Sequence, residues 1–131
     1  MERVIVDTSA IYALLDRSDA NHHRAVTLLR RIRDEGRLVV LTNFIVAETH
    51  ALILARLGYG PARLWLKGLR WPVERVRAED EERARGIIFA YEDKTFSYTD
   101  ATTFAVMERT GTRVAFAFDR HFLQFGFALY G

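Results

Sequence analysis

Short apolar runs alternate with helical patterns along this chain, and this alternation limits the possible folds more than any other feature. The predicted strands cover 3–6, 38–41, 73–76, 114–118 and, more briefly, 127–129, and all except 73–76 are mainly apolar. Segments with helical periodicity separate the first four of these strands from one another. The pattern predicts an α/β fold whose central sheet is mainly parallel and has four to five strands.

The helical patterns have recognisable boundaries. We expect helices over 8–16, 21–34, 43–57, 61–69, 79–91 and 99–109. Gly36, Gly58 and Gly111 follow three of these segments, at the position where glycine commonly ends a helix. Asn43 is a suitable residue type to cap the third helix, and Pro61 suits the first turn of the fourth.

The composition favours a single domain over residues 1–131, because a chain of 131 residues of which 50% are hydrophobic can build a core. The sequence has no cysteine, so oxygen or imidazole ligands would have to hold any metal. No apolar run is long enough to span a membrane, and the start of the chain becomes acidic too soon for a signal peptide. We therefore expect a cytoplasmic protein that does not enter the membrane.

Four acidic residues stand where a sheet of this kind would gather them. Asp7 and Asp119 directly follow apolar runs. Asp100 opens a helical pattern, and Glu48 is the only acid between residues 42 and 57. Ligands of parallel sheets bind outside the carboxyl ends of the strands, so we expect these side chains to converge. Converging carboxylates stay ionised together mainly when a divalent cation holds them, which predicts a metal-dependent hydrolase.

Three of these acids also have a purely structural alternative. Asp7 and Asp119 are good N-caps for the segments that follow them. Ser97 and Asp100 have the spacing of a capping box, in which each side chain satisfies a backbone N–H of the other residue. From the sequence alone, these acids could therefore serve only to start helices.

Glu48 needs a different alternative, because it lies inside its predicted helix and beyond any capping role. Its neighbours at helical spacing are apolar, and a carboxylate on an apolar face needs a partner or a metal. The alternative to a metal is a buried ion pair with Arg56 or His50.

Other catalytic signatures are missing from the sequence. It has no glycine-rich phosphate loop, no Gly-x-Ser-x-Gly motif and no pair of histidines at metal-ligand spacing. An aspartyl-phosphate enzyme of the haloacid-dehalogenase type would carry a second aspartate where this chain has Ser9. His121, two residues after Asp119, is placed to serve as a secondary phosphate or metal contact.

Four short segments, taken together, resemble the four acidic motifs of PIN domains. They are residues 5–10, 43–48, 97–101 and 118–122, and they follow the order of the family. The likeness extends over the whole chain and is greatest to the small prokaryotic members, the VapC-type ribonuclease toxins. Each motif is weak alone, whereas four in this order at these spacings are fairly specific.

The resemblance implies a three-layer α/β/α fold around a parallel sheet, and an endoribonuclease that uses Mg²⁺ or Mn²⁺. By position, the acidic quartet that holds the metal would be Asp7, Glu48, Asp100 and Asp119. Asp7 and Asp100 would be its principal metal ligands.

Supporting residues follow from the same motifs. Ser9 would orient Asp7 or a bound water, and Asn43 would help to shape the pocket. Arg120 would steady the phosphate. Many members of the family carry threonine or serine two residues before the last acid; this chain has Ala117 there, so a hydroxyl contact is missing.

The implied partners are an RNA substrate, a small antitoxin whose tail packs between helices, and a second copy of the chain in a homodimer. The leucine-rich stretch 52–69 offers such contacts, although core packing accounts for most of its apolar residues. Two other functions remain open: a catalytically weak module that binds nucleic acid or protein, and a metal-dependent phosphatase for small molecules. The intact quartet argues against the first, and the many arginines argue mildly against the second.

Overall fold

The structure, a computed structural model, describes residues 2–131, which form five strands and seven helices. The strands are β1 (Arg3–Val6), β2 (Leu38–Thr42), β3 (Val73–Glu74), β4 (Val114–Phe116) and β5 (Ala128–Leu129). The helices are α1 (Thr8–Leu15), α2 (His22–Asp34), α3 (Asn43–Leu57), α4 (Tyr59–Gly68), α5 (Ala78–Ala90), α6 (Tyr98–Thr110) and α7 (His121–Phe125). Among residues 2–131, no helix combines the length and apolarity that crossing a membrane would need.

All neighbouring strands of the sheet are parallel, in the order β3-β2-β1-β4-β5. β1 lies in the middle, and its Val4 is in register with Val39 of β2 and Val114 of β4. Residues 4–6 of β1 are buried, as expected for a strand covered on both faces. The predicted parallel sheet of four to five strands is confirmed.

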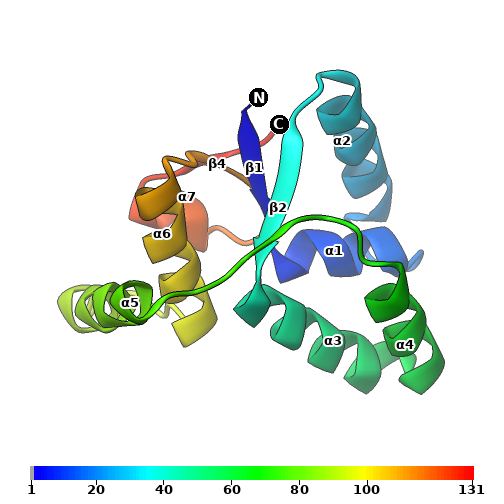
Figure 1. Cartoon of the computed structure of the whole chain (residues 1–131). Coiled ribbons are helices and arrows are strands. Elements are labelled where there is room, and N and C mark those ends of the chain that lie inside the picture. The colour runs from blue at the N-terminus through cyan, green and yellow to red at the C-terminus, as the bar shows by residue number, and fades with distance from the viewer. Residues whose placement is uncertain (1) are drawn as a thin grey trace.

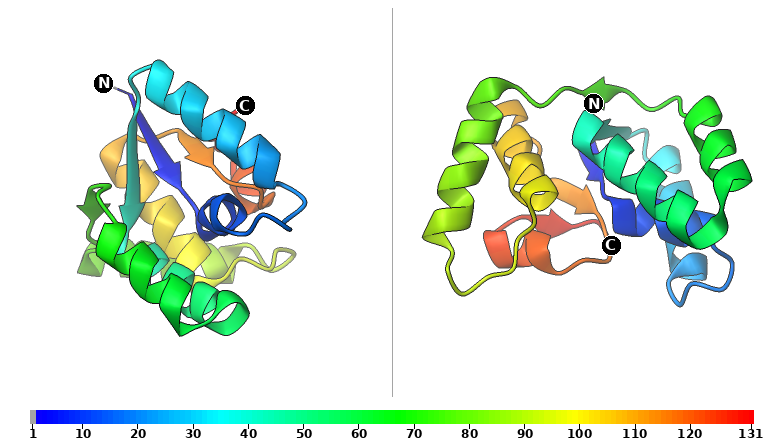
Figure 2. Two further views of the ribbon diagram at one scale, coloured as in Figure 1. Left: turned by 90° about the vertical axis from the view of Figure 1, so that its right-hand side faces the viewer. Right: turned by 90° about the horizontal axis from the view of Figure 1, so that it is seen from below.

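Helices cover both faces of this sheet. In Figure 1, α1 and α2 lie on one side of β1 and β2, whereas α6 and α7 lie on the other side, with α5 packed against α6. The pair α3 and α4 continues from the carboxyl end of β2, and α3 packs against α1 (Figure 2). The predicted three-layer α/β/α architecture is confirmed.

α6 is the most deeply buried helix, and aromatic packing fixes its position. Every residue from 100 to 107 is buried. The ring of Phe104 stacks on that of Phe125, with centroids 4.6 Å apart and planes 10° apart. Phe96 and Phe122 meet the same ring edge-on, at 5.1 and 5.3 Å. Offset and edge-on contacts of this kind stabilise aromatic cores, and here they hold the helix that begins with one of the four acids.

The start of α3 differs from the prediction by one residue. Thr42, not Asn43, is the N-cap, and its hydroxyl accepts a hydrogen bond from Ile45 N–H at 3.1 Å. Asn43 is already helical, and its side-chain carbonyl accepts from Val76 N–H at 2.8 Å. Because Val76 donates there instead of to a neighbouring strand, β3 stops at Glu74 and does not reach the predicted residue 76.

β4 is also shorter than predicted. It ends at Phe116, because Phe118 N–H donates to the hydroxyl of Ser9 at 3.0 Å and leaves the ladder. Asp119 therefore lies three residues beyond the strand instead of directly after it. This bend turns the segment toward the start of α1.

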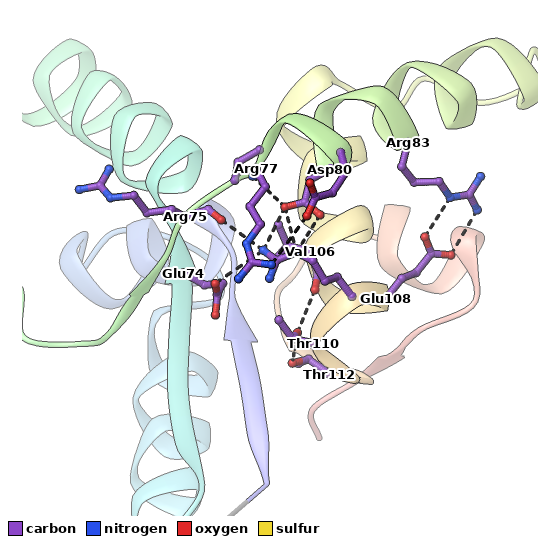
Figure 3. Close-up of polar contacts among 12 residues, drawn as sticks. Glu74, Arg75, Arg77, Asp80, Arg83, Val106, Glu108, Thr110 and Thr112 are labelled. Atoms are coloured by element: carbon purple, nitrogen blue, oxygen red, sulfur yellow. Dashed lines mark hydrogen bonds and ion pairs between the residues drawn. The ribbon is translucent and has the colours of Figure 1, made fainter.

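A charged cluster fastens the start of α5 to the end of α6 and to the last residue of β3 (Figure 3). Arg109 Nε lies 3.0 and 3.1 Å from the two carboxylate oxygens of Asp80, and its Nη2 reaches Arg75 O at 3.2 Å. The same Nη2 lies 3.6 Å from Glu74. Arg77 N–H donates to Asp80 at 2.8 Å, so this buried carboxylate is fully partnered.

Candidate metal centre

Asp7 lies at the middle of the sheet's carboxyl edge. Its backbone N–H donates to Phe116 O at 3.0 Å, which joins the end of β1 to β4. The strand order changes direction at β1, and ligands of open parallel sheets bind at such a switch point. The side chain is 5% exposed and also caps α1 by accepting from Ser9 N–H. The predicted capping role and the predicted site position therefore coincide.

Glu48 reaches the same edge from α3, and a hydroxyl holds it there. Thr8 Oγ1 donates to Glu48 Oε1 at 2.5 Å and lies 3.0 Å from Thr49 Oγ1. Within residues 2–131, no basic side chain lies within 4.0 Å of this carboxylate. The alternative of an ion pair with Arg56 or His50 is therefore not observed.

Asp100 has a helix-capping contact and a site contact at once. Its backbone N–H donates to Ser97 Oγ at 3.0 Å, and Ser97 N–H donates to Asp100 Oδ2 at 3.0 Å. This is the predicted capping box. The same Oδ2 lies 2.7 Å from Nδ1 of His121, and the residue is 7% exposed.

His121 joins the last two acids. Its Nδ1 lies 2.7 Å from Asp100 Oδ2 and 3.2 Å from Asp119 Oδ1. Both contacts are hydrogen bonds from Nδ1 when the imidazole carries its proton on that nitrogen. Asp119 Oδ1 also accepts from His121 N–H at 2.8 Å, whereas Arg120 occupies the N-cap position of α7. One potential ligand atom from each of these two acids and from the histidine lies within 4.8 Å of the others.

A cavity of about 520 Å³ opens where these segments meet. Its lining includes all four acids that the sequence singled out: Asp7, Glu48, Asp100 and Asp119. They come from the loop after β1, the middle of α3, the first turn of α6 and the loop after β4. Segments far apart in the chain thus place four carboxylates around one space.

The electrostatics of the cavity leave its carboxylates short of positive charge. Burial raises the pKa of Asp7 to about 7 despite hydrogen bonds from Ser9, and the charges of Asp100 and Glu48 add to the rise. Burial likewise raises the pKa of Glu48, against an opposing hydrogen bond from Thr8. Within the part of the chain that the structure describes, neither carboxylate has an ion-pair partner. Such a set of oxygen donors suits a divalent cation.

The sequence matches the family model of the PIN domain over residues 4–128. The chain belongs to the PIN-domain family. Two relatives from Mycobacterium tuberculosis share most of its length. The "23S rRNA-specific endonuclease VapC20" is 34% identical over 128 residues, which cover 95% of each chain. The "Ribonuclease VapC26" is 28% identical over 123 residues, covering 91% of this chain and 89% of the relative.

A solved structure agrees with this assignment. The crystal structure of Mycobacterium tuberculosis VapC20, titled a sarcin-ricin loop cleaving toxin, matches with a TM-score of 0.84 and 32% identity. The match covers 95% of this chain and 96% of the other. The predicted resemblance and the predicted PIN-like fold are confirmed.

The four supporting residues predicted for this PIN domain occupy different places. Ser9 and His121 line the cavity, and Ser9 Oγ donates to Asp7 at 2.8 Å. Asn43 is not among the lining residues, because its side chain is engaged with the segment that follows β3. Arg120 is exposed and also lies outside the lining.

Sequence reasoning missed three contributors to the cavity of this PIN domain. Thr8 holds Glu48, and Tyr12 and Arg56 line the cavity beside it. One available signal was the spacing along α3, where Glu48, Leu52 and Arg56 recur every four residues and so share one helical face. The contact of that face with α1 could not be read from the spacing alone.

Proposed function

We propose that this protein is an endoribonuclease that uses Mg²⁺ or Mn²⁺ to hydrolyse RNA phosphodiester bonds, and that it is the toxin of a toxin–antitoxin pair. The observation that carries the proposal is the convergence of four carboxylates in one cavity, two of them buried. Relatives of 34% and 28% identity that are named as an endonuclease and a ribonuclease support it.

The donor set fits the proposed cation. Mg²⁺ and Mn²⁺ prefer carboxylate oxygens, and the four acids would supply them, with Asp7 and Asp100 as principal ligands. When bound, a divalent cation lowers the pKa of water and offsets negative charge on phosphate oxygens. Glu48 and Asp119 complete the acidic lining, and imidazole is the less suited ligand for these ions.

Hydroxyl and imidazole groups would keep the carboxylates oriented. Ser9 donates to Asp7 while it accepts from Phe118 N–H, which ties the end of β1 to the loop after β4. The hydroxyl of Thr8 likewise donates to Glu48. Because these hydrogen bonds fix the orientation of the carboxylates, their free oxygen lone pairs would already point in a set direction. The side chains would then need to reorganise less when substrate binds.

An apolar cavity elsewhere supports the proposed antitoxin. It has a volume of about 670 Å³ between α2, β2 and the loop before β3, and its walls include Leu29 and Trp71. Four arginines also line it, at positions 30, 33, 37 and 70. Apolar walls with basic groups suit an acidic amphipathic tail.

The remaining assignments are also proposals. We place the protein in the cytoplasm and treat residues 1–131 as one domain, since a single cluster of buried side chains connects both helical layers. A homodimer is proposed from the exposed apolar side chains of α3 and α4, where Leu54, Leu64 and Leu66 are 43%, 71% and 47% exposed.

The test is cleavage of a mixed pool of single-stranded and structured RNA with Mn²⁺, with Mg²⁺ and with EDTA. We expect metal-dependent cleavage that falls on the order of 1,000-fold in Asp100→Asn, because a metal ligand charge is lost while the amide can keep the capping box. Asp7→Asn should behave alike, and the double variant should lose little more, since both residues serve one metal.

Asp34→Asn is the matched control, because Asp34 is an exposed acid at the end of α2 and should keep full activity. Full activity in a folded Asp100→Asn variant would remove Asp100 from the site. Binding of RNA without cleavage would favour the binding module, and hydrolysis of small phosphate esters alone would favour the phosphatase.

A further inference from the structure

α3 lays a row of three side chains along the wall of the acidic cavity. Glu48, Leu52 and Arg56 recur at intervals of four residues, and all three line the cavity. A helix rises 1.5 Å per residue, so Glu48 and Arg56 are anchored about 12 Å apart along the axis. The row thus runs from Glu48, beside the other acids, to the positively charged Arg56 on the same wall.

A buried aromatic ring holds the guanidinium of Arg56. Its central carbon lies 5.1 Å from the centroid of the Tyr12 ring, within the range of a cation–π contact. Tyr12 is 6% exposed, and its hydroxyl donates to Asp16 at 2.6 Å, which fixes the ring. No carboxylate among residues 2–131 lies within 4.0 Å of Arg56. Among the described residues, the positive charge of Arg56 therefore has no ion-pair partner.

The charges around the cavity make this arginine unusual. Five acids line it, the quartet together with Asp19. Among the described lining residues, Arg56 is the only arginine or lysine. A polyanion that enters must be held against these acids by bound cations near the quartet and, at the other end of the row, by Arg56.

We infer that Arg56, whose guanidinium lies over the ring of Tyr12, binds a phosphate of the RNA strand other than the scissile one. Successive phosphates of a stacked strand rise about 3.4 Å each, so an anchor separation of about 12 Å assigns Arg56 to a different phosphate from the one at the acids. A planar guanidinium suits this task because it presents paired donors to phosphate oxygens. This inference rests on the proposed function and makes the substrate an oligonucleotide, not a single phosphodiester.

The test separates binding from cleavage. Binding of a labelled single-stranded RNA 12-mer is measured for Asp100→Asn and for the same variant with Arg56→Ala, over a range of NaCl concentrations with Mg²⁺. We expect binding about fivefold weaker at low salt and a slope of log K against log salt that is smaller by about 0.7, the value for one lost phosphate contact to a single strand. Arg56→Lys should keep the salt slope because it keeps the positive charge. It should bind RNA less tightly, because an ammonium lacks the planar, paired donors of the guanidinium.

Arg63 provides the matched control. It stacks on Tyr59 of α4 at 5.4 Å in the same manner, but it lies outside the acidic cavity. Arg63→Ala should leave both the affinity and the salt slope unchanged. In the wild-type background, Arg56→Ala should slow cleavage of the 12-mer mainly by raising KM, whereas Arg63→Ala should not.

Each outcome decides the inference. An unchanged salt slope in Arg56→Ala, an equal loss in Arg63→Ala, or no measurable RNA binding by Asp100→Asn overturns it. A reduced slope together with no cleavage by the wild-type protein in Mg²⁺ or Mn²⁺ supports the phosphate site but defeats the proposed nuclease.

Discussion

Two buried aspartates in this molecule have opposite surroundings. Asp80, 2% exposed, receives hydrogen bonds from Arg109 and from Arg77 N–H. Asp7, 5% exposed, receives hydrogen bonds only from Ser9 among the described residues. Burial disfavours the ionised form of both aspartates. The difference between them therefore lies in their partners, an arginine for Asp80 and a serine for Asp7.

The pKa values follow this difference. Burial works to raise the pKa of Asp80, but the hydrogen bonds and charges of Arg109 and Arg77 outweigh it, and the pKa falls below its ordinary value. At Asp7 burial prevails, and the pKa rises to about 7. The fold thus supplies the structural carboxylate of Asp80 with a positively charged partner, whereas the carboxylate of Asp7 has no such partner among the described residues.

The largest change in stability is expected where the partnered carboxylate loses its cation. Arg109→Ala leaves Asp80 buried and uncompensated and should lower the free energy of unfolding by about 3–5 kcal/mol. Urea unfolding measures this, and RNA cleavage below the transition should be unchanged.

The control for this variant is Arg83→Ala. Arg83 pairs with Glu108 on an exposed surface of the same helix pair (Figure 3), so its loss should change the free energy of unfolding by less than about 1 kcal/mol. Equal effects of the two substitutions would contradict the contrast between the two aspartates.

A smaller effect should appear in the pH dependence of stability. In the folded protein Asp7 has a pKa of about 7, whereas the unfolded chain has an ordinary value near 3.9. Between these values only the folded state keeps the proton, so the contribution of Asp7 to the free energy of unfolding declines as pH rises from about 4 to 7. With EDTA present, we expect this decline to amount to roughly 2–4 kcal/mol.

Asp7→Asn isolates that contribution, because asparagine can still cap α1. The variant should be less sensitive to pH than the wild type, and Mn²⁺ at pH 8 should stabilise the wild type but not the variant. Identical urea midpoints for the two proteins at pH 5 and at pH 8 would contradict the raised pKa.

The smallest expected effect concerns the hydroxyl that holds Asp7. Ser9→Ala removes the hydrogen bond to Asp7 and leaves Phe118 N–H without its acceptor, so the free energy of unfolding should fall by about 1 kcal/mol. Cleavage should fall about tenfold because Asp7 is less well oriented. Ser9→Thr keeps a hydroxyl and should recover most of both, and a variant without any loss of cleavage would show that this hydroxyl does not orient the carboxylate.

The fold could be predicted from the sequence largely because local patterns were consistent with one another. The strand at 3–6 and the helix ended by Gly111 were correctly placed, since apolar runs and glycine positions act locally. The exact start of α3 was not predictable, because Thr42 and Asn43 are both good caps and only the length of β2 decides between them. Strand order was likewise invisible, since it depends on long-range pairing.

The acids of the candidate site could be predicted from the sequence, whereas the residues that contact them could not. Asp7, Asp100 and Asp119 could be found because each adjoins the end of a strand or the start of a helix, and Glu48 because it is a single acid in an apolar helix. The contact of Thr8 with Glu48 and the stacking of Arg56 on Tyr12 depend on how α1 packs against α3, and no spacing in the sequence encodes that packing.

The sheet order also bears on how the protein is made. β1 leaves the ribosome before the other four strands, yet β4, one of its two partners, follows only after β2 and β3. The nascent chain therefore cannot join Asp7 to Phe116, or place Asp119 in the same cavity, until these later residues have been made. A chain that stops before β4 carries at most three of the four acids, so under the proposed function its truncated products would lack part of the metal centre and would leave RNA intact.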